Sequence, residues 1–181
     1  ERIHDRFPQL TKERADRFAM GSQHKAAAAY EAGKIQPDLI PVATRNETGW
    51  GLATRDEALR PETTMEGLAS LKTPFRPHGR VTAGNSSGLN DGATASIIAS
   101  ADAAKELGLA PKMRMVSFAF AGVEPEIMGI GPVPSTEKAL RKAGLTIDDI
   151  GLFELNEAFA VQVLFLLDHF GIDDEDPRVN Q

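Results

Sequence analysis

Small and apolar residues recur at helical spacing near the start of the chain, between residues 15 and 30. The residues on this face are Ala15, Phe18, Ala19, Ser22, Ala26, Ala29 and Tyr30. Thr11 stands where a helix N-cap is needed, and Gly33 stands where a left-handed residue can end the helix. The pattern therefore predicts an amphipathic helix between Thr11 and Gly33 with one face buried.

This periodicity disappears between residues 34 and 80, where prolines separate short apolar pieces. The prolines are Pro37, Pro41, Pro61, Pro74 and Pro77. A segment of this length is too long for an ordinary loop. We expect it to be an excursion domain packed over another part of the protein, or a lid over a binding site.

Beyond residue 80 the pattern becomes that of an α/β protein. Residues 93–100 are small and apolar, which fits either a buried strand or a tightly packed helix. We favour the strand, because Ser100 can then cap a helix over residues 101–107 that ends at Gly108. The alternation of larger and smaller residues over 113–121 predicts another strand.

Three more elements are predicted in the last part of the chain. They are a helix over 135–143 capped by Ser135 and ended by Gly144, a strand over 150–155, and a helix over 158–170 ended by Gly171. Strands separated by helices favour a layered sheet with parallel pairing. The expected fold class is therefore α/β.

Composition narrows the class of protein. The 181 residues are 41% hydrophobic and 25% charged, as in an ordinary soluble globular domain. A net charge of -6 argues against a general nucleic-acid binder, and no apolar run is long enough for a membrane span or a signal core. The absence of cysteine excludes disulfides, thiolate metal sites and a cysteine nucleophile within this sequence. The histidines lack metal-ligand spacing, so no metal site is assigned.

Residues 84–92 form the first segment of chemical interest, with glycines at 84, 88 and 92 between short hydroxyl and amide side chains. Such glycines let a backbone pass close to a ligand, although a polar turn between two elements has the same composition. The same residues match the G-x-S-x-G elbow of serine hydrolases, with Ser86 as the nucleophile. That reading is disfavoured, because an elbow needs a strand directly before it and a helix directly after it.

Two further segments lie near predicted strand ends. Residues 128–134 hold two glycines and two prolines, but they lack the third glycine of a dinucleotide fingerprint. Residues 154–160 put Asn156 and Glu157 where a strand turns into a helix, which is where open α/β sheets present ligand groups. A structural turn in which both side chains are satisfied explains the spacing of this pair equally well.

Four segments together resemble the thiolase family, most closely the degradative 3-ketoacyl-CoA thiolases, also called acetyl-CoA C-acyltransferases. They are Arg60-Pro-Glu-Thr-Thr-Met-Glu-Gly-Leu68, Gly84-Asn-Ser-Ser-Gly-Leu-Asn-Asp-Gly92, Ile127-Met-Gly-Ile-Gly-Pro132 and Asn156-Glu-Ala-Phe-Ala160. Each motif is modest alone, but all four occur in the family's order and at its separations. The resemblance covers essentially the whole chain.

The resemblance implies a layered α-β-α architecture of the thiolase type, incomplete in this chain, with an inserted loop or lid domain. By analogy, residues 1–83 are the lid domain, 84–111 the last part of the N-terminal thiolase domain, and 112–181 the first part of the C-terminal domain. Thiolases are about twice as long as this chain. They use a nucleophilic cysteine, a histidine in Gly-His-Pro and a second cysteine, none of which this sequence contains.

The implied reaction is acyl transfer. Thiolases of this kind cleave 3-ketoacyl-CoA into acetyl-CoA and a shortened acyl-CoA in fatty-acid β-oxidation, through a cysteine thioester. We expect this activity of the full-length protein and expect the chain alone, which lacks the cysteine, to be inactive. The alternatives are a biosynthetic acetoacetyl-CoA thiolase and a non-catalytic module that binds CoA or assembles with partner chains.

The resemblance also assigns site residues. Asn156 would hold a water that donates to the thioester oxyanion, and Glu157 would support its turn. The residues expected at the coenzyme or substrate are Ser87 and Ala83 at the pantetheine arm, Phe75 and Leu71 beside the coenzyme, Met128 and Phe159 at the acyl pocket, Ala158 next to it, and Arg60 near the nucleotide. Gly67 occupies a lid position that is often serine in the family.

Coenzyme A and acyl-CoA are expected as substrates, and no permanently bound cofactor is expected. Lys72, Arg76 and Arg80 carry positive charge without a nearby acid in sequence, which predicts either a patch that attracts CoA phosphates or a solvated basic loop. The family implies a cytoplasmic homodimer or homotetramer, also associated with other β-oxidation enzymes. No nucleic-acid partner and no membrane span are expected.

Overall fold

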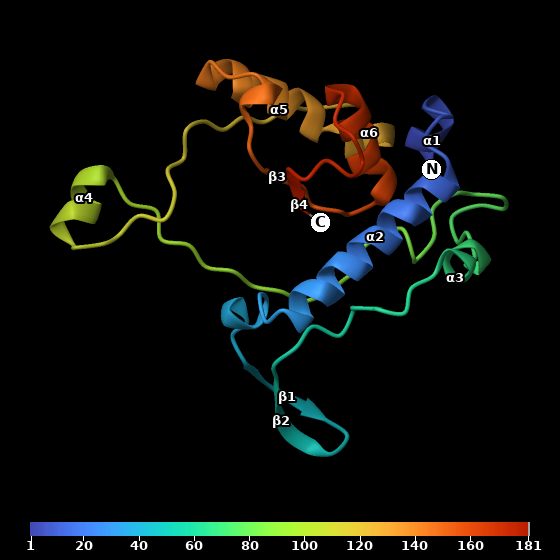
Figure 1. The fold of residues 1–181 in the computed structure, drawn as a ribbon, viewed down its shortest axis with the longest axis horizontal. Helices are drawn as coiled ribbons and strands as arrows, with labels where there is room; N and C mark the ends of the chain where they lie inside the picture. The colour runs from blue at the N-terminus through green and yellow to red at the C-terminus, as the bar shows by residue number, and fades with distance from the viewer. Residues whose placement is uncertain (181) are drawn as a thin grey trace.

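The computed structural model describes residues 1–180, with Asn46 described in its backbone only. Figure 1 shows the helices gathered around the long helix α2, with a hairpin and helix α4 projecting away from them. The helices are α1 (Arg2–Arg6), α2 (Lys12–Glu31), α3 (Met65–Ser70), α4 (Ala101–Glu106), α5 (Pro132–Ala143) and α6 (Ala160–Phe170). The strands are β1 (Val42–Asn46), β2 (Gly49–Ala53), β3 (Phe153–Glu154) and β4 (Val179–Asn180), and 3-10 turns occupy Gln36–Asp38, Pro125–Ile130 and Ile147–Asp149.

Helix α2 confirms the first sequence prediction. The Thr11 side chain accepts a hydrogen bond from the backbone N–H of Arg14 at 3.1 Å, which satisfies one of the unpaired donors of the first turn. Ala15 and Phe18 are buried, and the helix packs against both α3 and α6. Gly33 has a φ of +69°, a conformation that suits glycine after a helix end.

The hydrophobic core is centred on α6. Leu164 and Leu167 have no exposed surface, and Leu10 from the α1–α2 connection is equally buried in the same cluster. The predicted helix over 158–170 is confirmed, although it begins at Ala160, and Gly171 ends it with a φ of +66°. Helix α6 thereby joins α1, α2 and α5 around one apolar centre.

A charged clamp fixes α2 to the C-terminal part of the chain. The Arg14 guanidinium pairs with Asp168 of α6 at 2.7 Å and with Asp174 at 2.5 Å. Two carboxylates around one guanidinium raise the pKa of Arg14 further above its usual range, because both hydrogen bonds favour the charged form. This clamp and the α6 core hold α2 in one position relative to the second half of the chain.

Two boundaries in the second half differ from prediction. Helix α5 begins at Pro132 instead of Ser135, and the Ser135 hydroxyl donates back to Gly131 and Pro132 instead of capping the helix. Proline is tolerated in a first turn because its missing N–H has no intrahelical partner there. The strand predicted over 150–155 is reduced to β3, which pairs in parallel with the unpredicted β4.

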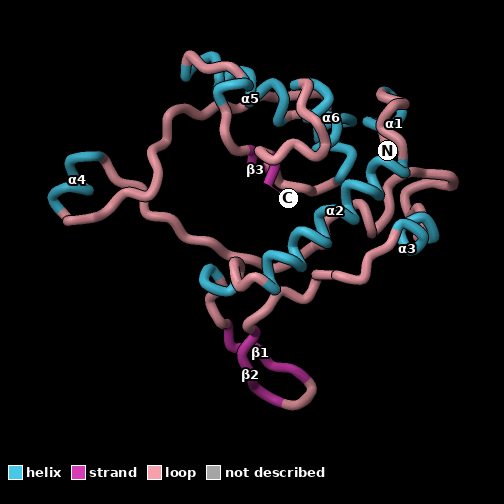
Figure 2. The backbone as a smooth tube through the Cα atoms, viewed as in Figure 1, coloured by secondary structure: helices cyan, strands magenta, loops and turns pink. Residues whose placement is uncertain are grey.

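The strands predicted over 93–100 and 113–121 are wrong for this structure. Figure 2 draws both segments as loops on either side of α4, and their apolar side chains are exposed. Ile97 is 89% exposed and Phe120 is 85% exposed. A strand needs a neighbour for its N–H and C=O groups, and within residues 1–180 neither segment has a ladder partner. Helix α4 between them is as predicted, with Ser100 capping the N–H of Ala103.

The segment from residue 34 to residue 80 contains structure that the sequence pattern did not reveal. Strands β1 and β2 form an antiparallel hairpin that projects from the body of the molecule, and α3 follows it. Thr64 caps α3 by accepting a hydrogen bond from the N–H of Gly67 at 3.1 Å. The segment then runs beside α2, which α3 contacts. Its interpretation as an excursion domain or lid stays a prediction.

Buried His4 gives the structure a predicted dependence on pH. Its ring is 1% exposed, Nδ1 bonds the carbonyl of Leu10, and Nε2 is buried without a partner among the described residues. Burial lowers the pKa of His4 below its ordinary 6.5, opposed by the Leu10 bond and assisted by the Arg80 charge, while the charge of Glu1 acts in the opposite direction.

Below pH 6.5 the unfolded chain therefore takes up a proton that folded His4 resists, so stability should fall as the pH is lowered from about 7 to 5. We expect denaturant unfolding at several pH values to show this decline, and His4→Gln to make it shallower. Equal slopes for the two proteins would contradict this assignment.

Candidate functional site

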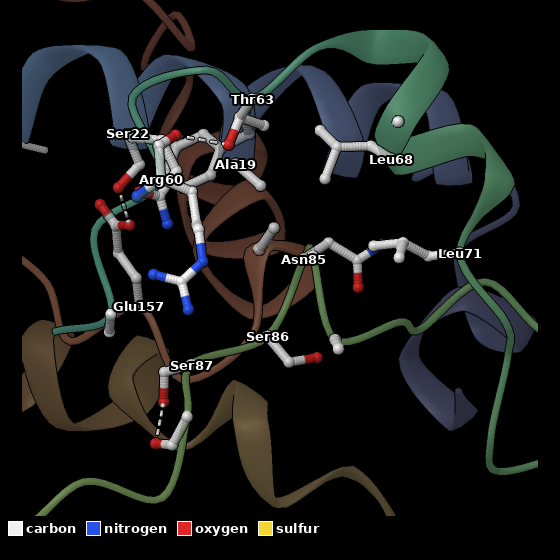
Figure 3. Close-up of a pocket in the computed structure, with 18 of the residues that line it drawn as sticks. Ala19, Ser22, Arg60, Thr63, Leu68, Leu71, Asn85, Ser86, Ser87 and Glu157 are labelled. Atoms are coloured by element: carbon white, nitrogen blue, oxygen red, sulfur yellow. Dashed lines mark hydrogen bonds between the residues drawn. The ribbon is translucent and has the colours of Figure 1, made fainter. Parts of the chain in front are cut away.

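An open cleft of about 910 Å³ lies beside α2. Figure 3 shows its walls: α2 on one side, the segment from Ala58 to Leu71 on another, the loop around Asn85, and the turn that carries Glu157. Four segments of the sequence therefore meet on one cavity. All of them except α2 contain one of the sequence motifs described above.

The turn between β3 and α6 presents Asn156 and Glu157 to this cleft. Glu157 is half-buried, and its Oε2 accepts a hydrogen bond from the Ser22 hydroxyl of α2 at 2.7 Å. Burial raises the pKa of the Glu157 carboxyl, while the Ser22 bond and the nearby Lys25 charge act in the opposite direction. Asn156 is exposed in the cleft, where its amide can bind water or a ligand.

The loop over residues 82–88 is held by the side chain of Asn85, which is 4% exposed. Its Oδ1 accepts from the N–H of Thr82 at 2.9 Å, and its Nδ2 donates to Asp16 at 2.8 Å and to the carbonyl of Arg80 at 2.9 Å. Asp16 also pairs with Lys12 at 2.5 Å. One asparagine therefore fixes this loop to α2.

The same loop pairs with the start of α6. The N–H of Ser87 donates to the carbonyl of Ala158 at 3.0 Å, and the N–H of Ala160 donates to the carbonyl of Asn85 at 3.0 Å. An isolated bridge joins Ser86 to Phe159. These bonds put the glycine-containing loop and the Asn156 turn side by side at the base of the cleft.

The hydrolase elbow finds no support in this geometry. The Ser86 hydroxyl donates to the carbonyl of Thr82 at 2.7 Å, so it is engaged with the backbone of its own loop. Within the described residues no strand directly precedes the loop and no helix directly follows it. An elbow requires both, because they expose the nucleophile at a sheet edge.

Close approach occurs at Gly84, one of the three glycines that the sequence singled out. A Cβ built there would lie 2.6 Å from Leu71 and closer still to Leu68. The loop therefore packs against the α3 wall through the bare glycine backbone. At this position a larger residue would have to displace the ends of the Leu68 and Leu71 side chains.

The structure brings six of the ten predicted site residues together. Those that line the cleft are Arg60, Leu71, Ala83, Ser87, Asn156 and Glu157. Ala158 and Phe159 lie behind it in the paired backbone just described. Phe75 and Met128 are outside the lining, and they are 68% and 72% exposed. The roles assigned to all ten residues stay predictions.

One of the three cations of the predicted basic patch, Arg76, has its charge offset by acids. Arg76 pairs with Asp5 at 2.7 Å and with Glu1 at 3.1 Å, and Arg80 donates to the carbonyl of His4. These acids lie about 70 residues earlier in the chain, so the local charge count could not reveal them. Arg76 therefore has acidic partners that lie outside the local segment, and the choice between a phosphate-attracting patch and a solvated basic loop stays a prediction.

Sequence reasoning missed the contribution of α2 to the cleft. Ser22 and Gln23 line it, and Gln23 Oε1 accepts from the N–H of Arg60 at 2.7 Å. Ser22 was assigned to the apolar face of the helix as a small residue. The available signal was Ser22 itself, a polar residue on a face otherwise made mainly of apolar residues.

Other classes of site are absent from the described residues. No cluster of three or more His, Cys, Asp or Glu side chains in residues 1–180 could hold a metal ion. No helix in the same range is both long and apolar enough to cross a membrane. The candidate chemistry of this chain therefore rests on the cleft.

The helical first half of this α/β chain and the turn between β3 and α6 share one cleft. The chain also matches a known enzyme family of two domains. The family description "Thiolase, N-terminal domain" matches residues 1–102, and "Thiolase, C-terminal domain" matches residues 109–181. The chain therefore belongs to the thiolase family.

Relatives and solved structures agree with this assignment. The 3-oxoadipyl-CoA/3-oxo-5,6-dehydrosuberyl-CoA thiolase of Escherichia coli (strain K12) is 49% identical over 94% of this chain and 43% of that relative. The 3-ketoacyl-CoA thiolase of Aliivibrio fischeri is 48% identical over 94% of the chain and 45% of that relative.

Human mitochondrial 3-ketoacyl-CoA thiolase has a TM-score of 0.91 at 40% identity, over 99% of this chain and 45% of that one. The Bacillus anthracis acetyl-CoA acetyltransferase has a TM-score of 0.89 at 38% identity, with the same coverage. The α/β fold of the thiolases is therefore shown, and the chain spans less than half the length of each of these proteins.

Proposed function

We propose that the full-length protein containing this chain is an acyl-CoA:CoA acyltransferase that cleaves 3-ketoacyl-CoA with a second CoA. The observation that carries the proposal is the meeting of Ser87 and Asn156 on one cleft, held together by the backbone bonds between residues 85–87 and 158–160. A long, partly apolar coenzyme arm fits a cleft of about 910 Å³ whose walls combine apolar side chains with many polar ones.

In this proposal the covalent step belongs to a cysteine thiolate that the present sequence does not contain. The thiolate attacks the 3-keto carbonyl, the bond between C2 and C3 breaks, and protonation of C2 releases acetyl-CoA. A second CoA thiol then takes the acyl group and restores the thiolate, which balances the reaction. This chain would supply the coenzyme wall and, through Asn156 and a water that it would hold, a donor to a thioester oxygen that gains negative charge.

Purified full-length protein should consume 3-ketoacyl-CoA only when free CoA is present and should form acetyl-CoA in equal amount. Loss of substrate without acetyl-CoA, or no CoA dependence, would refute the acyltransferase. We favour the degradative direction because relatives named 3-ketoacyl-CoA thiolase match over most of the chain. Net synthesis of acetoacetyl-CoA with poor thiolysis of longer substrates would indicate the biosynthetic alternative.

A second candidate concerns the substrate's far end. The relatives named for 3-oxoadipyl-CoA or β-ketoadipyl-CoA favour a dicarboxylic substrate over a fatty one. The clean comparison is 3-oxoadipyl-CoA against 3-oxohexanoyl-CoA, which share a six-carbon acyl chain and differ in the terminal carboxylate. A higher kcat/KM for the first would favour the dicarboxylic reaction and remove fatty-acid β-oxidation as the main role.

The 181-residue chain alone should show no thiolysis, because it has no cysteine to form the acyl intermediate. It should also self-associate, because Ile97, Met113 and Phe120 leave apolar surface exposed. Activity assays and size-exclusion chromatography at several concentrations measure both properties. Turnover by this chain, or a concentration-independent monomer, would contradict the respective statement.

The remaining family expectations are part of the proposal. Coenzyme A is a substrate and not a resident cofactor, and residues 1–83 act as the lid over it. The active protein is a cytoplasmic homodimer or homotetramer that associates with other β-oxidation enzymes. Mass determination and co-purification of the full-length protein test the last two statements.

A further inference from the structure

Three consecutive polar residues of α2 each bond a different neighbour around the cleft. Ser22 donates to Glu157 at 2.7 Å, Gln23 accepts from the N–H of Arg60 at 2.7 Å, and His24 Nε2 lies 3.0 Å from the carbonyl of Thr63. Figure 3 shows Ser22 and Glu157 facing each other across the cleft edge, with Arg60 beside them. Nothing in the proposed reaction requires these bonds directly.

We propose that Ser22 and Gln23 are positioning residues that hold the two functional walls of the cleft in register. Ser22 fixes the turn that carries Asn156, and Gln23 fixes the coenzyme wall that carries Arg60. This inference rests on the proposed acyltransferase function. It predicts that the wall carrying Asn156 affects kcat and that the wall carrying Arg60 affects KM for CoA.

Helix geometry explains why neighbouring residues serve different walls. Successive side chains on an α-helix point about 100° apart, so Ser22 and Gln23 face different directions from one rigid rod. The rod is itself fixed near its start by the Arg14 clamp and by the bond from Asn85 to Asp16. A displacement of either wall therefore has to break a bond to α2.

The Ser22 bond acts on the chemistry side of the cleft. Its acceptor, Glu157, is half-buried and directly follows Asn156 in the chain. Without the hydroxyl, this carboxylate loses a donor in a site where burial already disfavours its charge. The carboxylate then turns toward water or takes a proton, and the preceding asparagine moves with it.

The Gln23 bond acts on the binding side. It holds the backbone N–H of Arg60, while the Arg60 guanidinium folds back onto the carbonyls of Glu57 and Leu59 at 2.7 and 3.0 Å. Gln23 therefore fixes the short turn at Arg60, and the Arg60 side chain projects into the cleft. Loosening that turn alters a contact that is present before and during the chemical step.

The test uses full-length protein with Ser22→Ala and Gln23→Ala. Ser22→Ala should lower kcat about tenfold and leave KM for CoA within about twofold, since small displacements of reacting groups cost rate. Gln23→Ala should raise KM for CoA and the calorimetric Kd for CoA about tenfold and leave kcat nearly unchanged. The reason is that the Arg60 wall binds the coenzyme equally well in the ground state and in the transition state. Ser22→Thr and Gln23→Glu, which keep the donor and the acceptor, should recover most of each loss.

Ser135→Ala is the matched control, because this serine of α5 also donates a hydroxyl, but only to its own helix. The inference would be overturned if Ser22→Ala and Gln23→Ala lowered only the melting temperature. It would also be overturned if these two variants changed kcat and KM in the same way. If wild-type protein lacks thiolysis, the proposed function fails and the Ser22 assignment falls with it. The CoA titration with Gln23→Ala still decides the second assignment.

Discussion

Replacing Asn156 with alanine in the full-length protein is expected to lower kcat by about 10² to 10³ and to leave CoA affinity nearly unchanged. Asn156 lies at the turn between β3 and α6, and its amide is exposed in the cleft. A donor that acts where negative charge develops stabilises the transition state more than the bound substrate, and losing one typically costs about 3 to 4 kcal/mol.

Ser87→Ala provides the contrast within the same cleft. The Ser87 N–H is fixed to the carbonyl of Ala158, whereas its hydroxyl makes only a long bond of 3.4 Å to Gly88. The contact that we propose from this hydroxyl to the pantetheine arm would be made in both the ground state and the transition state. Its loss should therefore raise KM for CoA, with a smaller effect on kcat.

Steady-state kinetics and a direct CoA titration of both variants separate these outcomes. If Asn156→Ala raised KM with kcat preserved, the oxyanion role would be wrong. The Asn156–Glu157 pair would then be interpreted as the scaffold of the turn, which the sequence alone had left open.

Short-range signals in the sequence predicted four helices, α2, α4, α5 and α6, but not α1 or α3. The caps at Thr11 and Ser100 and the terminating glycines at 144 and 171 are used in the structure as expected. These features depend on backbone groups within one turn of the named residue, so a single sequence is sufficient to predict them.

Strands were predicted less well because a strand depends on a partner elsewhere. Residues 113–121 have the alternation of a strand, yet no neighbour pairs with them within residues 1–180. The two-residue strand β4 exists only because it lies beside β3, and nothing in its own sequence indicates it. Strand propensity shows only that a segment suits a pleated sheet surface. Whether a hydrogen-bonded ladder forms depends on a partner strand.

The site was predicted by its motifs and missed where it depends on tertiary contacts. The resemblance placed Asn156, Ser87 and Arg60 in one functional region, and the fold brings all three to the cleft. The bond from Ser22 to Glu157 spans 135 residues of sequence, and no local pattern predicts such a contact. The local sequence pattern did not predict the pairing of Arg76 with Asp5 for the same reason.

Asn85→Ala should be the most destabilising polar substitution near the cleft, lowering stability by about 2 to 4 kcal/mol. The substitution removes three hydrogen bonds at once and leaves the N–H of Thr82, the carbonyl of Arg80 and one oxygen of Asp16 short of a partner. Thr82 and Asp16 are 1% and 2% exposed, so water replaces these bonds poorly.

Asn90→Ala is the matched control, because it changes the same residue type five positions later in an exposed part of the same loop. Its effect on stability should stay within about 0.5 kcal/mol. Denaturant unfolding or calorimetric melting of the full-length variants gives the comparison. The double variant Asp16→Ala/Asn85→Ala should lose less than the sum of the two single losses, since both remove one shared bond. Additive losses, or an Asn85→Ala protein as stable as Asn90→Ala, would show that the loop is held to α2 by other contacts.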